Sequence, residues 1–338
     1  MQLIYDKRSL RSWSIPVGLL LVTFIVYVQF GAIYINGFDV IRFNLTDMEQ
    51  AVLFNIRIPR AIGAFFIGGM LAVAGAGLQG LFRNPLVDAG IIGVTTGASF
   101  AAVCVISLSA FLPVFWQDML GVYLLPFFAF LGSLFVCYAV YVFGKQYGST
   151  NVAMLILAGI AINAILGALT GLVIYFSDDT AIRSFTFWSM GELAGISWSK
   201  LTIIIPIALV SFWYFLKHVK ILDVLSLGEN EAFHLGVNLS RKNKEIILFS
   251  ALAVGAAVAF CGAIGFVGLV VPHIVRTAFG ASHQRVIPIS IVLGGLLLMW
   301  GDLFARTIVQ PSELPIGIIT SVIGGPFFMY LLIQYKRK

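Results

Sequence analysis

Charged residues are scarce in this chain. Lys, Arg, Asp and Glu make up only 11% of its 338 residues, whereas a soluble globular protein carries roughly 25%. Hydrophobic residues make up 60%, and the mean hydropathy is +1.00. Apolar runs long enough to cross a hydrocarbon core of about 30 Å recur along the whole length. The composition excludes a soluble domain, and because the runs do not alternate with period two, it predicts an all-α polytopic membrane protein.

The chain also lacks the residue patterns of common active sites. Its three cysteines lie singly in apolar runs, which argues against a disulfide or metal framework. Its four histidines are scattered without metal-ligand spacing, and no Ser/His/Asp set is evident. The phosphate-binding loop GxxxxGKS/T is absent, so the chain is not expected to bind ATP by that device. We therefore expect no enzyme activity, no metal and no bound cofactor, and an intramembrane enzyme is disfavoured.

The basic residues follow a membrane pattern. The net charge is +6, but Lys and Arg lie in short loops between apolar runs, which argues against a nucleic-acid partner. Lys7, Arg8 and Arg11 precede a first apolar run of about 20 residues without a small-x-small cleavage site, and we expect this run to be a retained span.

Ten membrane spans are predicted. They lie at about 14–35, 61–82, 90–112, 119–143, 152–176, 200–216, 246–264, 265–279, 287–305 and 315–335. The uncharged stretch 246–275 is too long for one crossing, and Gly262, Gly265 and Gly268 offer places to break it. An even number of spans puts both termini in the cytoplasm. The inner segments then hold 14 of the 21 Lys and Arg residues and the outer segments hold 6, with Arg276 inside a span.

A weak internal repeat accompanies the spans. Residues 64–85 and 251–272 align without gaps and share Gly, Ala and Pro positions. The two copies start an odd number of spans apart and therefore have opposite orientations. Inverted repeats are typical of transporters, with the pathway between the copies. The chain is thus expected to be one transmembrane domain, 1–338, with spans 2–5 (about 61–176) and 7–10 (about 246–335) as pseudo-repeats.

The longest inner loop, 217–244, has a docking pattern. It holds two short apolar-patterned pieces on either side of Gly228. A solvated connector is the simple interpretation. Short amphipathic helices on a cytoplasmic loop, however, indicate a soluble partner on which they dock, and such a partner could supply energy.

Few ionisable residues lie inside the predicted spans. Asp302 and Arg276 are the candidates that an ion-coupled secondary transporter would need. Asp302 is instead expected near a helix end, paired with Arg306 at i,i+4.

Several ordered motifs between Arg57 and about Leu332 carry a resemblance to a known family. They are RIPR (57–60), LAVAGAGLQGLFRNPL (71–86), GVTTGA (93–98), LAGIAIN (157–163), LGENEAFHLGV (227–237), GAIGFVGLVVPHIVR (262–276), DLFAR (302–306), ELPIGIIT (313–320) and GGPFF (324–328). With these motifs the chain resembles the FecCD-type permease subunits of ATP-binding-cassette (ABC) importers for iron chelates, haem and vitamin B12. The resemblance implies the type II importer fold with ten spans.

The same resemblance implies the partners. They are a second permease, identical or closely related, two cytoplasmic ATPase subunits that use the ATP, and a periplasmic or lipid-anchored substrate-binding protein. The expected location is the inner (cytoplasmic) membrane, in contact with membrane lipid and with both termini cytoplasmic.

The resemblance also assigns roles to residues of this chain. The cytoplasmic gate is expected at Asn84 and Leu86, with a second element at Ser149, Thr150 and Asn151. ATPase coupling is expected at Leu227, Gly228, Glu229, Ala232, Leu235 and Gly236. Docking of the binding protein is expected at Arg57, Arg60 and Arg306 on the outer face. The chain departs from the family in having Val87-Asp88-Ala89 where Ala-Asp-Pro is usual, and Glu192 where serine is usual.

The ligand is expected to be haemin. QGLFRNPL, LAGIAINAILGALTGL (157–172) and IRSFTFWSMG (182–191) resemble haemin permeases most, with ferric siderophores next and cobalamin or an oxyanion after them. Arg183 could guide haem propionates, and Phe187 and Trp188 could offer flat apolar surface. Alternatively, Arg183 anchors a loop to Asp178 or Asp179 and the aromatic residues form an interfacial belt.

Overall fold

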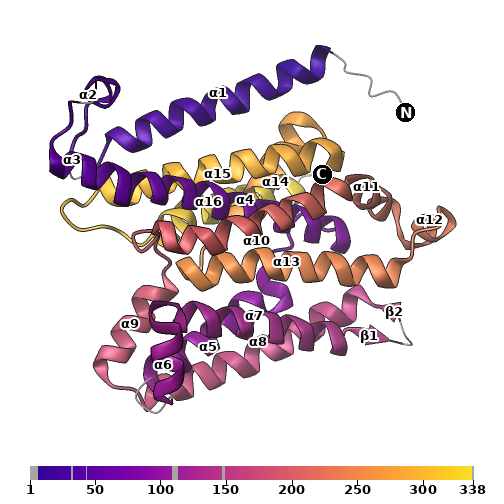
Figure 1. Ribbon diagram of the computed structural model, residues 1–338. Coiled ribbons are helices and arrows are strands. Elements are labelled where there is room, and N and C mark those ends of the chain that lie inside the picture. The colour runs from indigo at the N-terminus through magenta and orange to yellow at the C-terminus, as the bar shows by residue number, and fades with distance from the viewer. Residues whose placement is uncertain (1–6, 32, 43, 109–112, 147–148, 337–338) are drawn as a thin grey trace.

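The computed structural model describes residues 7–31, 33–42, 44–108, 113–146 and 149–336. Nearly all of these residues are helical or lie in short connections (Figure 1). The elements are α1 (Lys7–Gln29), α2 (Gly37–Ile41), α3 (Asp47–Val52), the π-helical turn η1 (Leu53–Arg57), α4 (Ile58–Phe82), the 3-10 turn η2 (Ala89–Ile92), α5 (Val94–Leu108), α6 (Val114–Leu120), the 3-10 turn η4 (Gly121–Tyr123), α7 (Leu124–Phe143), β1 (Lys145–Gln146), β2 (Ser149–Thr150), α8 (Val152–Tyr175), α9 (Asp179–Ser189), α10 (Trp198–Lys217), α11 (Val219–Leu227), α12 (Glu229–His234), α13 (Leu239–Cys261), α14 (Val267–Phe279), α15 (His283–Thr307) and α16 (Ile316–Lys336).

The apolar helices correspond to the predicted spans. Among the described residues, six helical segments are long and apolar enough to cross a membrane, and four shorter apolar helices accompany them. The six are Asp47–Phe82, Phe115–Phe143, Val152–Tyr175, Trp198–Lys217, Leu239–Cys261 and His283–Thr307, and the four are Gly18–Gln29, Val94–Leu108, Val267–Phe279 and Ile316–Leu331. Each of the ten overlaps one predicted span, so the predicted all-α arrangement of about ten apolar helices is confirmed.

The long uncharged stretch breaks where a glycine permits it. α13 ends at Cys261, and Gly262 follows with φ +70°, a conformation that glycine adopts without a Cβ penalty. A Cβ on Gly262 would also overlap the backbone of Trp188. α14 then starts at Val267, so the predicted division of 246–275 into two helices is confirmed.

α4 forms the centre of the fold. Nearly all of its residues are buried, and it packs against α13, α14 and α15. A Cβ at Gly68 would overlap the backbone of Gly294 in α15, and one at Gly75 would overlap Gly268 in α14. The small residues of α4 therefore allow close helix approach, as such spacing does in membrane proteins.

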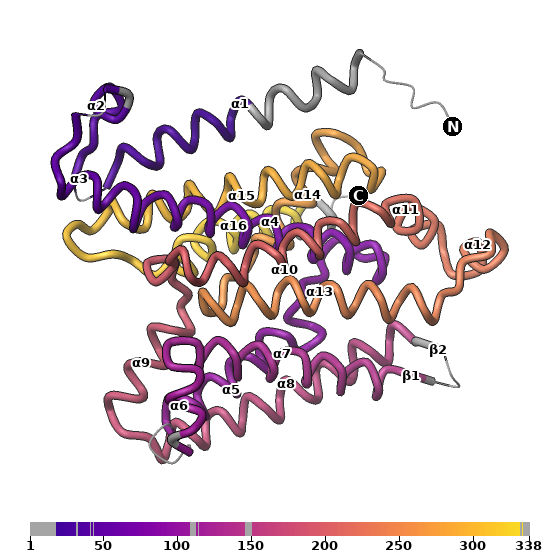
Figure 2. Tube along the Cα trace, in the orientation of Figure 1, coloured from indigo at the N-terminus to yellow at the C-terminus, as the bar shows by residue number. Residues whose placement is uncertain are grey.

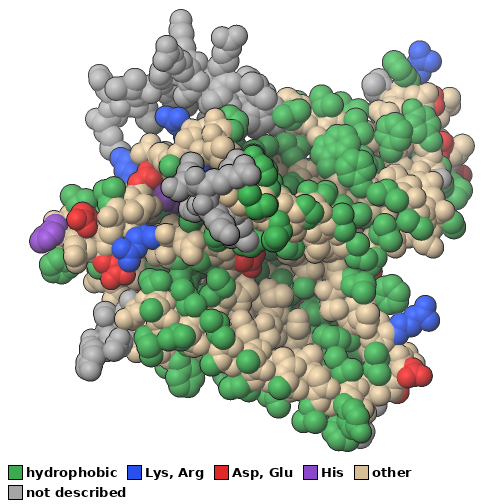
Figure 3. All heavy atoms as spheres, turned by 180° about the vertical axis from the view of Figure 1, so that it is seen from behind, with side chains coloured by type: hydrophobic (Ala, Val, Ile, Leu, Met, Phe, Trp, Pro, Cys, Tyr) green, Lys and Arg blue, Asp and Glu red, His purple; other side chains and the backbone are tan. Residues whose placement is uncertain are grey.

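α8 has the opposite environment. Of its 24 residues, only Leu155 and Gly159 are buried, although the helix is apolar around its whole circumference. It lies at the edge of the molecule, beside α5 and α7 (Figures 1 and 2). On the rear face, hydrophobic side chains are spread over the surface between areas of backbone and other side chains, and most visible charged side chains lie toward the two ends (Figure 3).

The two ends of the helix bundle carry different elements. At one end lie the start of α1, the end of α16, the helices α11 and α12, and the β1–β2 hairpin (Figure 1). We call this the coupling-loop end. At the opposite end lie α2, α3, α6 and α9, and we call it the α9 end.

Candidate functional site

A tight polar turn follows α4 at the coupling-loop end. Arg83 ends the helix in the left-handed conformation, with φ +51°. The Asn84 side-chain oxygen accepts a hydrogen bond from the Leu86 backbone N–H at 2.9 Å, and Asp88 Oδ1 accepts one from Gly90 N–H at 2.6 Å. Burial raises the pKa of the Asp88 carboxyl above its ordinary value. These Asx turns close residues 84–86 and 88–90 without the proline that the family usually has after Asp88. We call residues 83–88 the gate hairpin.

The second predicted gate element precedes α8. Ser149 and Thr150 form β2, which pairs antiparallel with β1. Asn151 caps α8, because its side-chain oxygen accepts hydrogen bonds from the backbone N–H groups of Ala153 and Met154. The structure thus explains how Asn151 fixes the start of α8, while the joint gate with Asn84 and Leu86 stays a prediction.

The predicted coupling residues lie in two layers. α11 and α12 are separated by Gly228, whose φ of +132° few other residues adopt, and α12 is followed by Gly236 at φ +78°. Toward the membrane helices, Leu222, Leu225 and Ala232 are buried. Away from them, Leu227, Phe233 and Leu235 are exposed by 63–70%. An exposed apolar group on a loop indicates a docking surface.

The gate hairpin contacts the coupling loop. Arg83 Nη2 lies 3.4 Å from Glu229 Oε1, and both side chains are more than 40% exposed. Such an exposed pair contributes about 0–1 kcal/mol. The pair is informative about position, because it shows that the predicted gate and the predicted coupling helices are neighbours.

An arginine cluster lies at the α9 end. We use this name for Tyr27, Arg57, Arg60, Asp302, Arg306 and Glu313. Arg60 makes two hydrogen bonds to Asp302, at 2.8 and 2.9 Å, and two to Glu313, at 2.8 and 3.1 Å. Tyr27 of α1 also donates its hydroxyl to Asp302. Asp302 therefore joins α1, α4 and α15.

The other two arginines of the cluster bind the chain near the end of α1. Arg57 donates to the carbonyls of Val28, at 2.6 Å, and Gln29, at 2.9 Å, and also to that of Ile33. Arg306 lies over the Tyr27 ring, 4.1 Å from its centroid, and donates to the Tyr27 carbonyl.

Two expectations about these residues need correction. The predicted Asp302–Arg306 pair is wrong, because the arginine that pairs with Asp302 is Arg60, from α4. Arg57, Arg60 and Arg306 lie at the predicted outer end, but their exposed fractions are only 3–6%. α1 and its following loop cover Arg57 and Arg306, and Arg60 is enclosed with Asp302 and Glu313. They are not the exposed docking charges that the sequence suggested, and their role toward a binding protein stays a prediction.

Arg183 and the nearby aromatic residues lie on α9. Asp178 caps this helix by accepting from Ala181 N–H at 2.7 Å. Arg183 is exposed and lies over the ring of Phe187, 5.8 Å from its centroid, while Trp188 stacks on Phe185. In the described part of the chain, Arg183 forms no salt bridge with Asp178 or Asp179, so the loop-anchoring alternative has no ion pair to support it.

Three motifs that are far apart in the sequence meet beside α9. Glu192 N–H donates at 2.8 Å to the carbonyl of Cys261, the residue before GAIGF, and a Cβ on Gly262 would overlap the Trp188 backbone. Ile316 N–H donates to the Gly191 carbonyl at 2.9 Å. Gly317 N–H donates to the Met190 carbonyl at 2.9 Å. WSMGEL, GAIGF and ELPIG thus form one backbone junction. The glycine in each motif was the only signal of this, because a close backbone approach leaves no room for a Cβ.

Arg276 is held by an amide. It donates to the Gln79 side chain in α4, and Gln79 donates to the Gly268 carbonyl at 3.1 Å. Asp302 is held by Arg60. The two ionisable candidates for an ion-coupled transporter are therefore bound within the helix packing.

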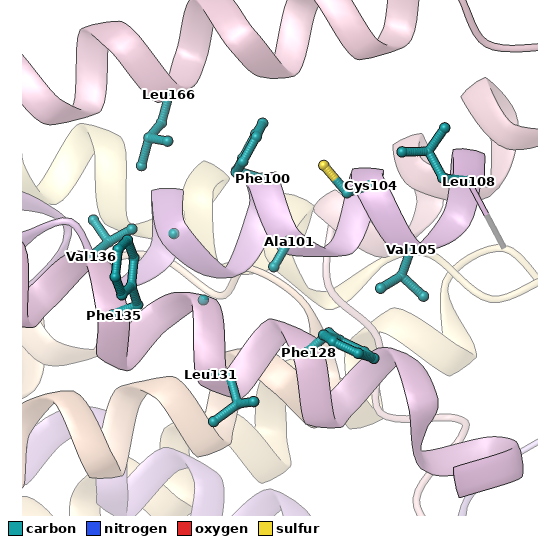
Figure 4. Close-up of a pocket in the computed structure, with 12 residues that line it drawn as sticks. Phe100, Ala101, Cys104, Val105, Leu108, Phe128, Leu131, Phe135, Val136 and Leu166 are labelled. Atoms are coloured by element: carbon teal, nitrogen blue, oxygen red, sulfur yellow. The ribbon is translucent and has the colours of Figure 1, made fainter. Parts of the chain in front are cut away.

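A cavity of about 440 Å³ lies between α5, α7 and α8 (Figure 4). Phe100 and Cys104 of α5 and Leu131 of α7 line it, with Leu166 of α8 above them. Ligand sites usually combine apolar walls with a few convergent polar groups. This cavity has apolar side chains and one thiol, and we assign it no role in ligand recognition.

Comparisons with known proteins agree over nearly the whole chain. The FecCD transport family matches residues 19–334. A haemin transport system permease of Yersinia pestis is 38% identical over 326 residues, which cover 95% of this chain and 96% of that protein. A vitamin B12 import system permease of Vibrio cholerae is 36% identical over 329 residues, which cover 97% and 96%.

A solved structure is similar as well. It is described as an inward-facing conformation of a metal-chelate type ABC transporter, with a TM-score of 0.84 and 32% identity, and the match covers 94% of this chain and 97% of that one. Relatives with different ligands match almost equally well. The comparisons therefore support one class of transporter without distinguishing its ligands.

Proposed function

The chain belongs to the FecCD transport family and is the multi-pass permease subunit of an ABC importer, and from this premise we propose that it carries haemin across the inner membrane. Ferric siderophore import is the next candidate, and cobalamin or oxyanion import follows. In this proposal the coupling-loop end faces the cytoplasm and the α9 end faces outward. Both termini are then cytoplasmic.

Energy comes from partner subunits in this proposal. Two ATPase subunits dock on the exposed side chains of Leu227, Phe233 and Leu235 and use ATP that this chain does not bind. A periplasmic or lipid-anchored binding protein delivers the ligand at the α9 end. A second permease, identical or related, completes the pathway, and the exposed apolar surface of α8 supports such a dimer, because it offers a large area for helix packing.

Passage through the chain is controlled at the coupling-loop end. Asn84 and Leu86 close the pathway together with Ser149, Thr150 and Asn151. The Asx turn at Asn84 and the cap at Asn151 support this role, because each fixes the backbone of a short segment at the coupling-loop end. Contact between Arg83 and Glu229 gives the ATPases a route to this gate.

One observation carries the haemin proposal. An exposed guanidinium, that of Arg183, lies beside flat aromatic rings on α9 at the proposed entrance. Haemin combines two propionates with a flat apolar macrocycle. A guanidinium can hold a carboxylate through two parallel hydrogen bonds, and aromatic faces can pack on the macrocycle. Import requires weak contacts, so these side chains guide haemin and do not hold it tightly.

Transport by the reconstituted complex tests the proposal. Wild-type complex in proteoliposomes should take up haemin in an ATP-dependent manner, in preference to ferric siderophores and cobalamin. Arg183→Ala should lower haemin uptake about tenfold, the effect of losing one charge-assisted hydrogen bond. Arg183→Lys should restore uptake only in part, because lysine keeps the charge and loses the two-pronged geometry.

Arg42→Ala is the matched control, because Arg42 is an exposed arginine elsewhere at the α9 end. It should transport haemin at the wild-type rate. If both Arg183 variants take up haemin at the wild-type rate, α9 does not line the pathway. If the wild-type complex takes up cobalamin or a ferric siderophore in preference to haemin, that compound is the ligand.

A further inference from the structure

A partly buried polar contact joins the coupling loop to the start of α15. Asp223 of α11 accepts hydrogen bonds through Oδ1 from the His283 backbone N–H, at 2.6 Å, and from His283 Nδ1, at 2.9 Å. Its Oδ2 accepts from the Ser282 hydroxyl at 3.0 Å. A carboxylate only accepts, so Nδ1 carries the proton. Asp223 therefore caps the N-terminus of α15 from another helix, where negative charge is favourable.

The other edge of the His283 ring faces α4. His283 is only 3% exposed, and Nε2 has no hydrogen-bond partner among the described residues. It points at Gly80, where an added Cβ would lie 2.9 Å from Nε2 and 3.5 Å from Leu222. Gly80 is in the last turn of α4, three residues before Arg83. The missing side chain at Gly80 thus lets α4, α11 and α15 meet at one point beside the gate hairpin.

The coupling loop therefore reaches the hairpin by two routes. The Arg83–Glu229 pair is exposed and contributes about 0–1 kcal/mol. The Asp223–His283 contact is more buried and charge-assisted, and it fixes direction as well as distance. Leu222 and Leu225 also hold α11 on α4 and α15, but apolar contacts between helices permit sliding. The polar contact is the one that defines how α11 is oriented on its neighbours.

We propose that Asp223 and His283 are positioning residues that make α11, the start of α15 and the end of α4 move as one body. When the ATPases displace the coupling loop, this joint carries the displacement to residues 83–88, and without it α11 turns on its apolar contacts while the hairpin stays in place. The inference rests on the proposed ATPase coupling but not on the identity of the ligand.

Coupling between ATP use and transport is the first measurement. In the complete complex, the number of ligand molecules transported per ATP hydrolysed should fall about tenfold in Asp223→Ala, the effect of losing a charge-assisted hydrogen bond on a two-state equilibrium. Asp223→Asn should lie between wild type and Ala, because an amide oxygen still accepts from His283 but lacks the charge. ATP hydrolysis and assembly should remain near wild type in both variants.

The matched control is Arg285→Gln. Arg285 is exposed, lies two residues after His283 on α15, and donates a hydrogen bond to the nearby carbonyl of Phe279 at 2.8 Å. This variant should couple normally. A wild-type coupling ratio in Asp223→Ala would overturn the proposal. Loss of assembly in both Asp223 variants would also overturn it, because the pair would then serve folding.

A second measurement is independent of the ligand. The distance between the two hairpins is measured with a spin label at Pro85→Cys on each of the two permease chains, in a background with the native cysteines replaced. Pro85 lies in the hairpin, and its side chain takes no part in the hydrogen bond of the Asx turn at Asn84. Nucleotide should change this distance in the labelled complex and not in the same complex with Asp223→Ala. If the permease binds no ATPase subunit, the proposed function is wrong. If the hairpin distance changes with nucleotide in Asp223→Ala as it does in wild type, only the proposed role of Asp223 and His283 is wrong.

Discussion

Asp302 is the residue on which the α9 end depends most. Its carboxylate is 1% exposed and receives hydrogen bonds from Arg60 in α4 and Tyr27 in α1. An ionised carboxylate is costly to bury unless it is paired and hydrogen-bonded. Here two donors from different helices satisfy it, so the charge fixes the relative positions of α1, α4 and α15.

Asp302→Asn should destabilise the chain by about 3 kcal/mol, because it leaves the buried Arg60 with only the partly exposed Glu313 as a carboxylate partner. Unfolding in detergent, followed by tryptophan fluorescence, measures the loss; Trp300 is a suitable probe because it donates to Thr23 of α1 at 3.1 Å. Glu313→Gln is the control and should cost no more than about 1 kcal/mol, since its side chain is 43% exposed. Equal losses would contradict the central role of Asp302.

Residue roles were the least predictable part of the chain. The sequence indicated that Arg57, Arg60 and Arg306 lie at one end, which the structure confirms, but not that they are buried. Arg57 and Arg306 are covered by α1, which contacts them from more than twenty positions away in the sequence, and Arg60 is held by Asp302 and Glu313. Spacing within RIPR or DLFAR carries no information about such a cover.

At the scale of elements, close packing of α4 on α15 is the main feature. The backbones meet at Gly68 and Gly294, where neither helix has room for a Cβ. In a membrane, where helices gain little from the hydrophobic effect, such close contact provides much of the attraction between them.

Gly68→Ala should therefore destabilise the chain by about 1–3 kcal/mol through overpacking, although alanine is intrinsically the better helix former by about 1 kcal/mol. Gly18→Ala in α1 is the control, because no atom of another element lies within 4 Å of a Cβ there, and it should be neutral or stabilising. Thermal unfolding of both variants in detergent gives the comparison. A stabilised Gly68→Ala chain would show that α4 and α15 can separate at no cost.

Elements with a strong hydrophobic signal were predictable and short ones were not. The ten apolar helices and the division at Gly262 follow from run length and glycine position alone. The helices α2, α3, α6 and α9 were not predicted, because they have no long apolar run and depend on caps such as Asn36, Thr46 and Asp178. Amphipathic pieces around Gly228 were recognised because their apolar residues repeat at helical spacing.

At the scale of the whole molecule, the two ends have different tasks in the proposed function. The α9 end receives the ligand, and the coupling-loop end closes the pathway and responds to the ATPases. The sequence predicted which motifs share an end, because span parity fixes this. It did not predict the junction of WSMGEL, GAIGF and ELPIG, since contacts between distant segments leave no periodic signal.

Replacing both Asn84 and Leu86 with alanine should make the complex leak. The change removes the Asx turn together with the polar and apolar side chains at the proposed gate. Loaded proteoliposomes containing the complete complex should then release haemin without nucleotide, whereas wild-type vesicles should retain it.

Asn84→Asp is the control for this experiment, because its side-chain oxygen can still accept from Leu86 N–H and keep the turn. Vesicles with this variant should remain tight. If vesicles with the double alanine variant also retain haemin, the gate lies elsewhere in the complex.

The long sequence distance between packed partners has a consequence for synthesis. Arg60 and Asp302 are 242 residues apart. At ribosomal speeds of about 5–20 residues per second, α15 is therefore synthesised roughly 10 to 50 seconds after α4. During that interval the glycine face of α4 meets lipid, and Arg60, near the end of the helix, can reach the watery interface. α4 therefore has to be stable first in lipid and later in protein, and its apolar sequence, combined with small residues, suits both surroundings.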